Sequence, residues 1–382
     1  MTISTVIVNY NSADFAIGCA HSLLAQDTGP HGPLEILVVD NASHAEDRAR
    51  LDGLPEGVRR IDSPDNLGYA GAANLGFEAA KGEILGLLNP DLLFMPGSVR
   101  ALADAVAADP SIGAVGPRTW MDEGRTIQHP VNRLPRLVEE VRTALRFRSR
   151  DAIRRESLRS TRHSVRYWQT EAPLDIEMLS GACLFFRREV LAQAGEFDAT
   201  YPLYYEDADW CRRVGAAGLR LVYDPRSEIV HFYNMSAGTV PEMAQRKREA
   251  SHRLYFQKTV GSLGASVAVR LDRGNARRMA RVAMDPPWEV ENLGALEDPP
   301  VLEFPSDEAY VIEFAGTPLF EYAAATCVRA ARFAFPGDLW HKMPPSEVFV
   351  RLVRERDFAI VGAWRFRRND GADGGAESTP DR

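Results

Sequence analysis

In roughly the first 120 residues, short apolar runs alternate with longer segments in which apolar residues recur every three or four positions. The short runs predict buried strands, and the longer periodic segments predict amphipathic helices. The predicted strands are 6–8, 36–39, a short one near Ile61, 84–88 and 112–115. The predicted helices are 14–26, one within 66–82 after a glycine-rich turn, and 97–108. This alternation is typical of βαβ units around a mostly parallel sheet, so we expect an α/β fold.

The pattern continues to about residue 260 and then weakens. A strand at 178–186, a helix at 206–217 and a strand at 219–223 complete the predicted first domain, 1–260. Proline-rich joints follow, with strands at 301–304, 311–314 and 358–366 and a helix at 319–333. These elements predict a smaller α+β appendage over 261–368. The polar, glycine-rich residues 369–382 are expected to form a disordered tail.

Composition narrows the classes of protein that fit. The 382 residues carry a net charge of −8, which argues against a general nucleic-acid binder. Four scattered cysteines without a paired motif predict buried free thiols rather than a zinc site or a disulfide framework. Neither a signal peptide nor a run of about 18 apolar residues is apparent. We therefore expect a cytoplasmic protein that can touch the inner face of the membrane.

Polar residues follow the predicted strands at 6–8, 36–39 and 84–88, where ligands bind in open α/β sheets. Asn9 and Asp40 each come directly after a strand. The Asp40 carboxylate could accept a hydrogen bond from a nucleobase or ribose, although Asp-Asn-Ala-Ser also suits a turn. Asn89 and Asp91 flank Pro90; Asp91 could hold a divalent ion that bridges two phosphates, or the segment is only a strand-ending turn.

The segment 66–74 places small residues, Gly68 among them, where the backbone can approach a ligand closely after Asn66. A helix that begins there would favour phosphate. The segment is neither a G-x-G-x-x-G nor a Walker motif. The sequence therefore lacks the usual signature of dinucleotide-dependent oxidoreductases, methyltransferases and ATPases. It also lacks the glycine- and arginine-rich loop of nucleotidyltransferases.

A cluster of acidic and aromatic residues opens the helix predicted at 206–217. The cluster consists of Tyr204, Tyr205, Glu206, Asp207, Asp209 and Trp210. Acids at a helix start are stabilised by the helix dipole without any further role. A carboxylate between aromatic rings could also act as general base toward an acceptor hydroxyl. His231, after the next strand, is either a metal or phosphate ligand or a structural histidine.

Taken in order, six motifs resemble glycosyltransferase family 2, and more narrowly its rhamnosyltransferase-like branch. The resemblance covers about residues 1–260. The motifs are Val6–Asn11, Val38–Ser43, Asn66–Gly71, Asn89–Asp91, Gly195–Asp198 and Glu206–Asp209.

The resemblance implies a GT-A fold and an inverting transfer from a nucleotide-diphosphate sugar. Its nucleotide-sugar site would comprise Asn9, Asp40, Asn66, Gly68, Asn89 and Asp91. A divalent cation, Mg²⁺ or Mn²⁺, would be bound by Asp91 and His231. Asp207 would be the base and Glu206 its orienting partner, with Tyr205, Asp209 and Trp210 around the acceptor or sugar. Asn89 departs from the first acid of the family's Asp-x-Asp motif and supplies no charge there.

The same resemblance suggests dTDP-rhamnose as the donor, with UDP- and GDP-linked hexoses as alternatives. The acceptor would be a glycan or a polyprenyl-diphosphate-linked sugar in bacterial surface polysaccharide synthesis. A non-catalytic nucleotide-sugar- or glycan-binding subunit is the competing interpretation. The presence of both Asp91 and Asp207 argues against it.

The insertion 133–166 contains eleven arginines against four acids, interleaved with leucine, valine and phenylalanine. One interpretation is a solvated pair of basic helices. The other is an interfacial patch that meets anionic lipid headgroups or the diphosphate of the acceptor.

Overall fold

The computed structural model describes residues 1–232, 241–343 and 346–369. They form two compact units, the first built from 1–120, 132–141 and 170–273 and the second from 121–131, 142–169 and the residues from 274 onward. The domain limits at 260 and 368 stay a prediction. The expected disordered tail lies, apart from residue 369, outside the described residues.

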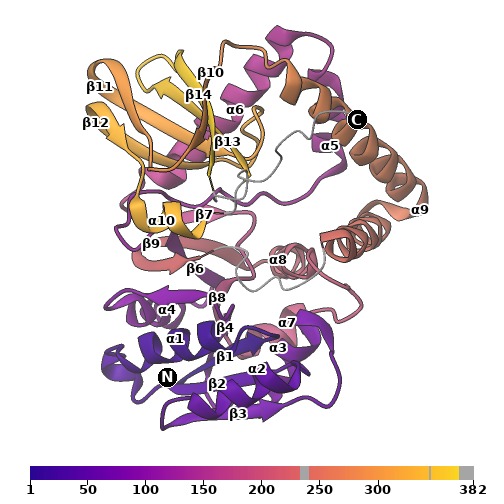
Figure 1. The fold of residues 1–382 in the computed structure, drawn as a ribbon. Helices are drawn as coiled ribbons and strands as arrows, with labels where there is room; N and C mark the ends of the chain where they lie inside the picture. The colour runs from indigo at the N-terminus through magenta and orange to yellow at the C-terminus, as the bar shows by residue number, and fades with distance from the viewer. Residues whose placement is uncertain (233–240, 344–345, 370–382) are drawn as a thin grey trace, which may run out of the picture. The chain divides into compact units, whose positions relative to one another are not determined.

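The first unit is built on a nine-stranded sheet in the order β3-β2-β1-β4-β8-β6-β9-β5, with β7 paired to β9 (Figure 1). The strands are β1 Ile3–Asn9, β2 Glu35–Asp40, β3 Val58–Asp62, β4 Ile84–Leu88, β5 Leu92–Phe94, β6 Ile112–Trp120, β7 Leu174–Ile176, β8 Cys183–Arg187 and β9 Arg220–His231. β1, β2, β3, β4, β6 and β9 run in one direction, whereas β5, β7 and β8 are antiparallel to their neighbours. The predicted α/β fold with a mostly parallel sheet is confirmed.

Helices cover both faces of this sheet because each presents an apolar side to it. α1 and α4 pack with one set of strand side chains, and α3, α7 and α8 pack with the other. The helices are α1 Ala13–Leu24, α2 Ala45–Arg50, α3 Gly68–Ala79, α4 Ser98–Ala108, α7 Glu189–Ala194 and α8 Glu206–Ala216, with short 3₁₀ turns at Gly29–His31 and Leu51–Gly53. Of the cysteines, Cys19, Cys183 and Cys211 are buried free thiols as expected, and Cys327 is half-buried.

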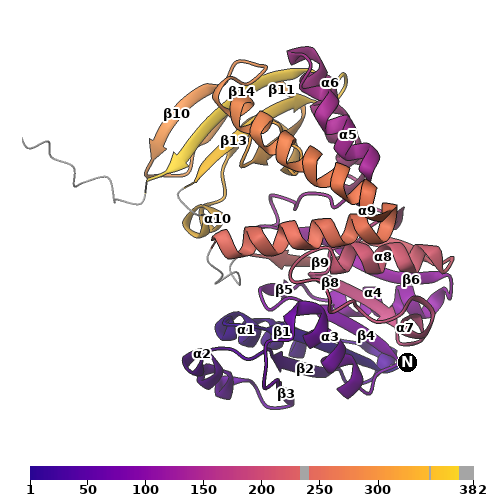
Figure 2. The ribbon, with the colours of Figure 1, turned by 90° about the vertical axis from the view of Figure 1, so that its right-hand side faces the viewer.

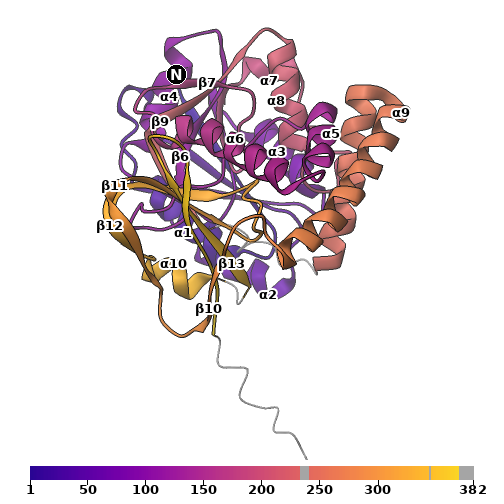
Figure 3. The same ribbon diagram turned by 90° about the horizontal axis from the view of Figure 1, so that it is seen from above.

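A long bent helix, α9 (Pro241–Met284), follows the first sheet. Gly261 breaks it with a non-helical backbone, φ 76° and ψ 175°, so the helix consists of two arms that meet at a bend (Figure 2). α5 (Leu137–Arg146) runs beside α9 (Figure 3), and its Leu137 packs with Ala265 and Ala268 of the second arm.

The second unit contains a five-stranded sheet in the order β10-β14-β13-β11-β12. Its elements are β10 Glu291–Leu296, β11 Val301–Ala315, β12 Ala324–Ala334, β13 Glu347–Arg354, β14 Ile360–Arg368, α6 Arg150–Trp168 and α10 Gly337–Lys342. α6 is joined to the sheet by a buried network in which Arg351 pairs with Glu313 and also donates to Ser157 and Thr161. The expected α+β appendage is confirmed.

Two predictions for the C-terminal half are wrong. The helix predicted at 319–333 is largely strand β12, because ten residue pairs with β11 override the helix propensity of an alanine-rich segment. The residues directly after 262, where the periodic pattern weakens and no helix is predicted, form the second arm of α9. Gly261, Gly264 and Gly274 lower the helix propensity of this sequence.

Candidate active site

The carboxyl ends of β1, β2 and β4 meet at one edge of the first sheet. β1 pairs in parallel with β2 and with β4, and Asn9 stands opposite Asp40. β4 ends at Leu88, so the segment Asn89–Asp91 follows at the same edge. The polar residues predicted to share a ligand-binding edge are therefore brought together.

Asn9 and Asp40 are completely buried at this edge. The Asn9 amide donates to Asp40 Oδ1 at 3.1 Å and to Ser43 Oγ at 3.1 Å, and Arg48 Nε donates to Asp40 Oδ2 at 3.0 Å. Burial alone would raise the pKa of Asp40, but hydrogen bonds from Ser43, Arg48 and Asn9 outweigh it and lower that pKa. Asp40 is thus an ionised carboxylate that holds the loop after β2 in place.

Asn41, a residue that sequence reasoning missed, connects that loop to the start of α3. Its side-chain oxygen accepts from the Leu67 amide at 2.8 Å, and its amide donates to Asn66 Oδ1 at 3.2 Å. Asn66 Oδ1 also accepts from the Gly68 amide at 3.0 Å. Gly68 has φ +72°, which favours glycine. The predicted nucleotide residues Asn66 and Gly68 therefore form one polar turn with Asn41.

Asp91 and His231 form a second polar pair. β5 pairs with β9 so that Leu92 stands opposite His231, which brings His231 Nε2 to 3.3 Å from Asp91 Oδ1. The Asp91 side chain is buried, and neither of its carboxylate oxygens accepts a hydrogen bond from the described residues. A buried carboxylate without donors is costly unless a cation or a ligand satisfies it. Together with an imidazole it offers the oxygen and nitrogen ligands that Mn²⁺ and Mg²⁺ sites use.

Glu206 and Asp207 begin α8 directly after two strained residues. Tyr204 and Tyr205 adopt φ angles of 65° and 71°, in the left-handed region that costs a non-glycine residue about 1–3 kcal/mol and is enriched at functional sites. Asp207 Oδ2 accepts from the Gly181 amide at 3.0 Å, and Oδ1 accepts from the Ala208 amide at 2.7 Å. The strained turn and these amides fix the direction of the Asp207 carboxylate.

The environments of the two acids differ. Burial, together with the nearby Asp207 charge, raises the pKa of Glu206 to about 8. Burial also raises the pKa of Asp207, but the Gly181 and Ala208 amides stabilise its ionised form and oppose that rise. When one proton is shared by such a pair, we expect it to reside on Glu206, which leaves Asp207 as the available base.

Tyr69 contacts the loop that donates to Asp207, and sequence reasoning missed it. Burial and then the negative charges of Glu206, Asp207 and, more weakly, Asp91 raise its pKa well above the usual value. Its hydroxyl donates to the Gly181 carbonyl at 2.8 Å, while the Gly181 amide donates to Asp207. The backbone carbonyl of the next residue, Ala182, accepts a hydrogen bond from the backbone N–H of Asn89 at 2.8 Å. The loop 180–182 thus links the Asn89–Asp91 turn to the start of α8.

Of the three residues expected around the acceptor or sugar, Asp209 and Trp210 are buried in the packing of α8, whereas Tyr205 is half-buried and its place beside the acceptor stays a prediction. Trp210 is fully buried, donates to the Gly195 carbonyl at 3.0 Å and stacks on Phe197. Asp209 is buried and pairs with Arg213 at 2.8 Å. The Tyr205 ring packs against Tyr255 and, edge-on, against His252. Trp210 and Asp209 therefore stabilise α8, and Tyr205 joins it to α9.

Comparison with protein families identifies the chain. The model of Glycosyl transferase family 2 matches residues 4–194, half of the 382 residues. The chain belongs to glycosyltransferase family 2. The match includes the Asn89–Asp91 turn, and the protein is a glycosyltransferase with the α/β architecture expected of the family.

Curated relatives add detail. An N-acetylglucosaminyl-diphospho-decaprenol L-rhamnosyltransferase of Mycobacterium tuberculosis is 32% identical over 234 residues, which is 55% of this chain and 70% of the relative. An O-antigen biosynthesis protein RfbC of Myxococcus xanthus is 28% identical, over 63% of this chain and 18% of the relative. Among solved structures, a mannosyltransferase from Pyrobaculum calidifontis in complex with GDP-Man and Mn²⁺ aligns with a TM-score of 0.44 at 20% identity, over 74% of this chain and 75% of its own.

Gly181 offers a direct test of how Asp207 is positioned. A Cβ atom at Gly181 would lie 3.1 Å from Asp207 Cβ and 3.4 Å from its Oδ2, so Gly181→Ala should shift the Asp207 side chain by a few tenths of an ångström. We expect kcat of the glycosyltransferase to fall, by less than the roughly 10²-fold that displacements near 1 Å can cause, with little change in Tm. Gly215→Ala is the matched control, since a Cβ there meets nothing within 4 Å. Equal kinetics for the two variants would contradict the assignment.

Glu206 should reduce stability at alkaline pH. The folded protein binds its proton more tightly than the unfolded chain does, because the pKa rises from an ordinary 4.5 to about 8. The stability gained is therefore present at acid pH and is lost as pH rises from 4.5 through 8. We expect Glu206→Gln to raise the free energy of unfolding at pH 8.5 by at least about 1 kcal/mol and to have little effect at about pH 4 and below, where the carboxyl is protonated in the folded and the unfolded chain. Urea unfolding at both pH values measures this difference.

Proposed function

We propose that this glycosyltransferase moves a sugar, with inversion at the anomeric carbon, from a nucleotide-diphosphate donor to a hydroxyl of a glycan or polyprenyl-diphosphate-linked acceptor. The leading donor is dTDP-rhamnose and the setting is bacterial surface polysaccharide synthesis. The observation that carries the proposal is that the loop 180–182 connects the two acidic parts of the site: Gly181 donates to Asp207, and Ala182 accepts from the backbone amide of Asn89, two residues before Asp91. The similarity to a rhamnosyltransferase whose name specifies a decaprenol-linked acceptor supports the choice of substrates.

The proposed chemistry divides the site between two carboxylates. Asp91 and His231 would hold a divalent cation, Mg²⁺ or Mn²⁺, which when bound neutralises charge on the departing diphosphate. Asp207 accepts the proton of the acceptor hydroxyl as that oxygen bonds to the anomeric carbon and the bond to the diphosphate breaks. Glu206 retains its proton and so keeps a second negative charge away from Asp207.

The donor side of the site would be built from the loops after β1 and β2 and the start of α3. Asp40, through Asn9 and Arg48, holds its loop in the conformation that receives the nucleotide. Asn66, Gly68 and Asn41 form the adjoining polar turn. In this proposal Asn89 contacts the ribose or diphosphate as a neutral partner to Asp91.

A donor screen tests the proposed function. We expect dTDP-rhamnose with Mn²⁺ to raise the Tm more than UDP- or GDP-linked hexoses do, and the loaded enzyme to transfer rhamnose to polyprenyl-diphosphate-linked N-acetylglucosamine. Asp14→Asn, which alters an exposed carboxylate, is a control that should transfer normally. A Tm shift without transfer to any acceptor would favour the competing non-catalytic sugar-nucleotide binder.

Contact with the membrane surface forms part of the proposal. No helix in the described part of the chain is long and apolar enough to cross a membrane. α5 exposes Val138 and Val141, and the second arm of α9, with the residue just before its bend, exposes Val260, Leu263 and Val267. Val138 and Val141 are three residues apart on α5, and Leu263 and Val267 are four apart on the second arm of α9, so each pair lies on one face of its helix. Leu263 is 82% exposed.

Arginines accompany these apolar rows and favour an anionic surface. Arg253 precedes Val260 by seven residues, Arg270 follows Val267 by three, and both are exposed. Apolar rows with flanking arginines are typical of helices that lie in a membrane interface. This placement develops the interfacial interpretation of the arginine-rich insertion, which contributes α5.

Vesicle co-sedimentation tests the membrane contact. We expect the protein to bind vesicles that contain anionic lipid, and the double variant Val138→Gln/Leu263→Gln to lose at least about tenfold in partitioning, since each buried CH₂ group contributes about 0.8 kcal/mol. Tyr322→Ser, which changes an exposed aromatic residue of the second unit, is the matched control. Equal binding of wild type to purely neutral vesicles would contradict the role of the arginines.

A further inference from the structure

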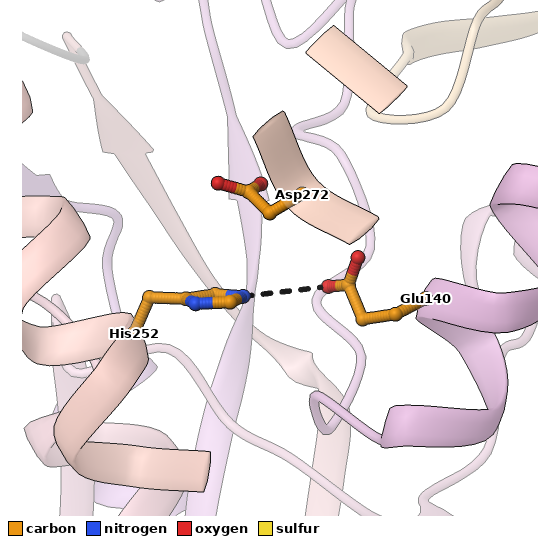
Figure 4. Close-up of side chains that lie close together, drawn as sticks. All are labelled: Glu140, His252 and Asp272. Carbon is orange, nitrogen blue, oxygen red and sulfur yellow. Dashed lines mark ion pairs between the residues drawn. The ribbon is translucent and has the colours of Figure 1, made fainter. Parts of the chain in front are cut away.

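Glu140, His252 and Asp272 meet on the first unit (Figure 4), and the cluster shares no residue with the Asp91–His231 pair. Glu140 comes from α5, His252 from the first arm of α9 and Asp272 from the second. In a straight helix His252 and Asp272 would lie about 30 Å apart, at about 1.5 Å per residue. The bend at Gly261 turns the second arm back, so the ligand atoms of all three side chains lie within 4.8 Å of one another.

His252, in the middle of this cluster, is a buried histidine with a ring nitrogen left unpaired by the described part of the chain. The residue is 1% exposed, and its Nε2 has no hydrogen-bond partner among the described residues. Nε2 points at Glu140 Oε1 from 3.6 Å (Figure 4), beyond hydrogen-bond distance. The ring is held by Phe256 on one side and the Tyr205 ring on another. A buried nitrogen left unpaired costs about 1–3 kcal/mol, and a bound ion would remove that cost.

We propose that Glu140, His252 and Asp272 bind a first-row divalent metal ion, with Zn²⁺ or Co²⁺ as suitable probes. One imidazole and two carboxylates are ligands that these ions accept. Bonds of about 2.1 Å place the ligand atoms of a tetrahedral site about 3.4 Å apart. The ligand atoms lie within 4.8 Å of one another, so the side chains must close around the ion by up to about 1.4 Å. Arg248 donates to Asp272 Oδ2 at 3.3 Å and so holds that carboxylate in its orientation without binding the ion itself.

The ion would act as a structural clip. It joins α5 to both arms of α9, and the His252 ring contacts Tyr205, the residue that immediately precedes Glu206. Metal binding here would therefore stabilise the strained turn before α8. The site is independent of the proposed transfer reaction, because it uses neither Asp91 nor His231 and requires no sugar donor.

Metal binding by the full chain in the Asp91→Asn background tests the site with the donor-linked cation site disabled. After treatment with EDTA and dialysis, we expect this protein to bind about one Co²⁺ per chain without nucleotide, with visible absorption bands of a coordinated ion and a raised Tm. Adding Glu140→Gln or Asp272→Asn should weaken Co²⁺ binding by at least about tenfold. Glu139→Gln, on the same helix but outside the cluster, should leave it unchanged.

Two results would overturn the proposal. One is an Asp91→Asn protein that binds no Co²⁺ or Zn²⁺ without nucleotide. The other is equal binding by the Glu140→Gln and Glu139→Gln variants, which would assign His252 to a simple ion pair with Glu140. Because the assay contains no donor and measures no transfer, a negative result leaves the proposed function untouched, and the reverse also holds.

Discussion

Asp207→Asn should lower kcat by about 10³-fold, within the roughly 10²–10⁴-fold range of general-base catalysis, while donor affinity stays within about twofold of wild type. The amide keeps the size of the carboxylate but cannot accept the acceptor proton. Asp207 accepts hydrogen bonds from the Gly181 and Ala208 amides, so the asparagine oxygen can replace at most one of these contacts. Initial rates and calorimetric titration of the donor separate the effect on chemistry from the effect on binding.

Glu206→Gln is the informative contrast to that variant. It removes an acid that stays protonated while Asp207 titrates, because burial and the Asp207 charge raise the pKa of Glu206 to about 8. The rising limb of the pH profile of kcat should therefore stay in place in Glu206→Gln, whereas Asp207→Asn should show no base-limited limb. An Asp207→Asn protein with near-wild-type kcat would assign the base role to another residue, and a fall in kcat matched by a fall in Tm would indicate a folding defect instead.

Much of this site is predictable because polar residues at the ends of parallel strands must share an edge. Asn9, Asp40 and Asp91 follow three neighbouring strands, and their grouping needs only the βαβ pattern. The acids of α8 are recognisable by their position at a helix start. These predictions depend on local periodicity, which the sequence displays directly.

Other parts of the site depend on strand pairing that local patterns do not reveal. His231 reaches Asp91 because the three-residue strand β5 pairs with the end of β9. Tyr69 and Gly181 lie 112 residues apart and meet through one hydrogen bond. A signal for Gly181 was present in the sequence, since a glycine before a buried strand often marks a close approach of another group.

The errors have a common physical cause, which is that burial and pairing override composition. Trp210 lies among acidic residues in the sequence, a composition typical of a sugar pocket. In the structure, however, its ring stacks on Phe197 in the core. The alanine-rich residues of β12 favour a helix in isolation, yet pairing with β11 makes them a strand. The bent α9 remained undetected because its glycines interrupt a polar pattern that a short window interprets as loop.

Asp91→Asn should abolish cation-dependent donor binding and lower kcat/KM by at least about 10³-fold, the loss of several kcal/mol expected when charge neutralisation at the leaving group fails. The carboxylate is buried and accepts no hydrogen bond from the described residues, so its charge has no structural partner there besides His231 at 3.3 Å. An asparagine side chain carries no charge to offset that of a divalent ion, and only one of its two terminal atoms can act as an acceptor. Titration of the nucleotide diphosphate with Mn²⁺ and with EDTA measures the loss.

Asn89→Asp is the matched test in the opposite direction, because it adds the acid that the family's Asp-x-Asp motif has at this position. A second carboxylate two residues from Asp91 should tighten Mn²⁺ binding by about tenfold, since affinity for hard cations rises with the number of charged ligands. Asp91→Asn should instead abolish Mn²⁺ binding. Adding Asn89→Asp to the Asp91→Asn protein should not restore this binding fully, because only Asp91 lies beside His231. Activity in EDTA equal to that in Mn²⁺, for the wild type and for both variants, would exclude a cation at Asp91 and would leave the diphosphate to be neutralised by basic side chains.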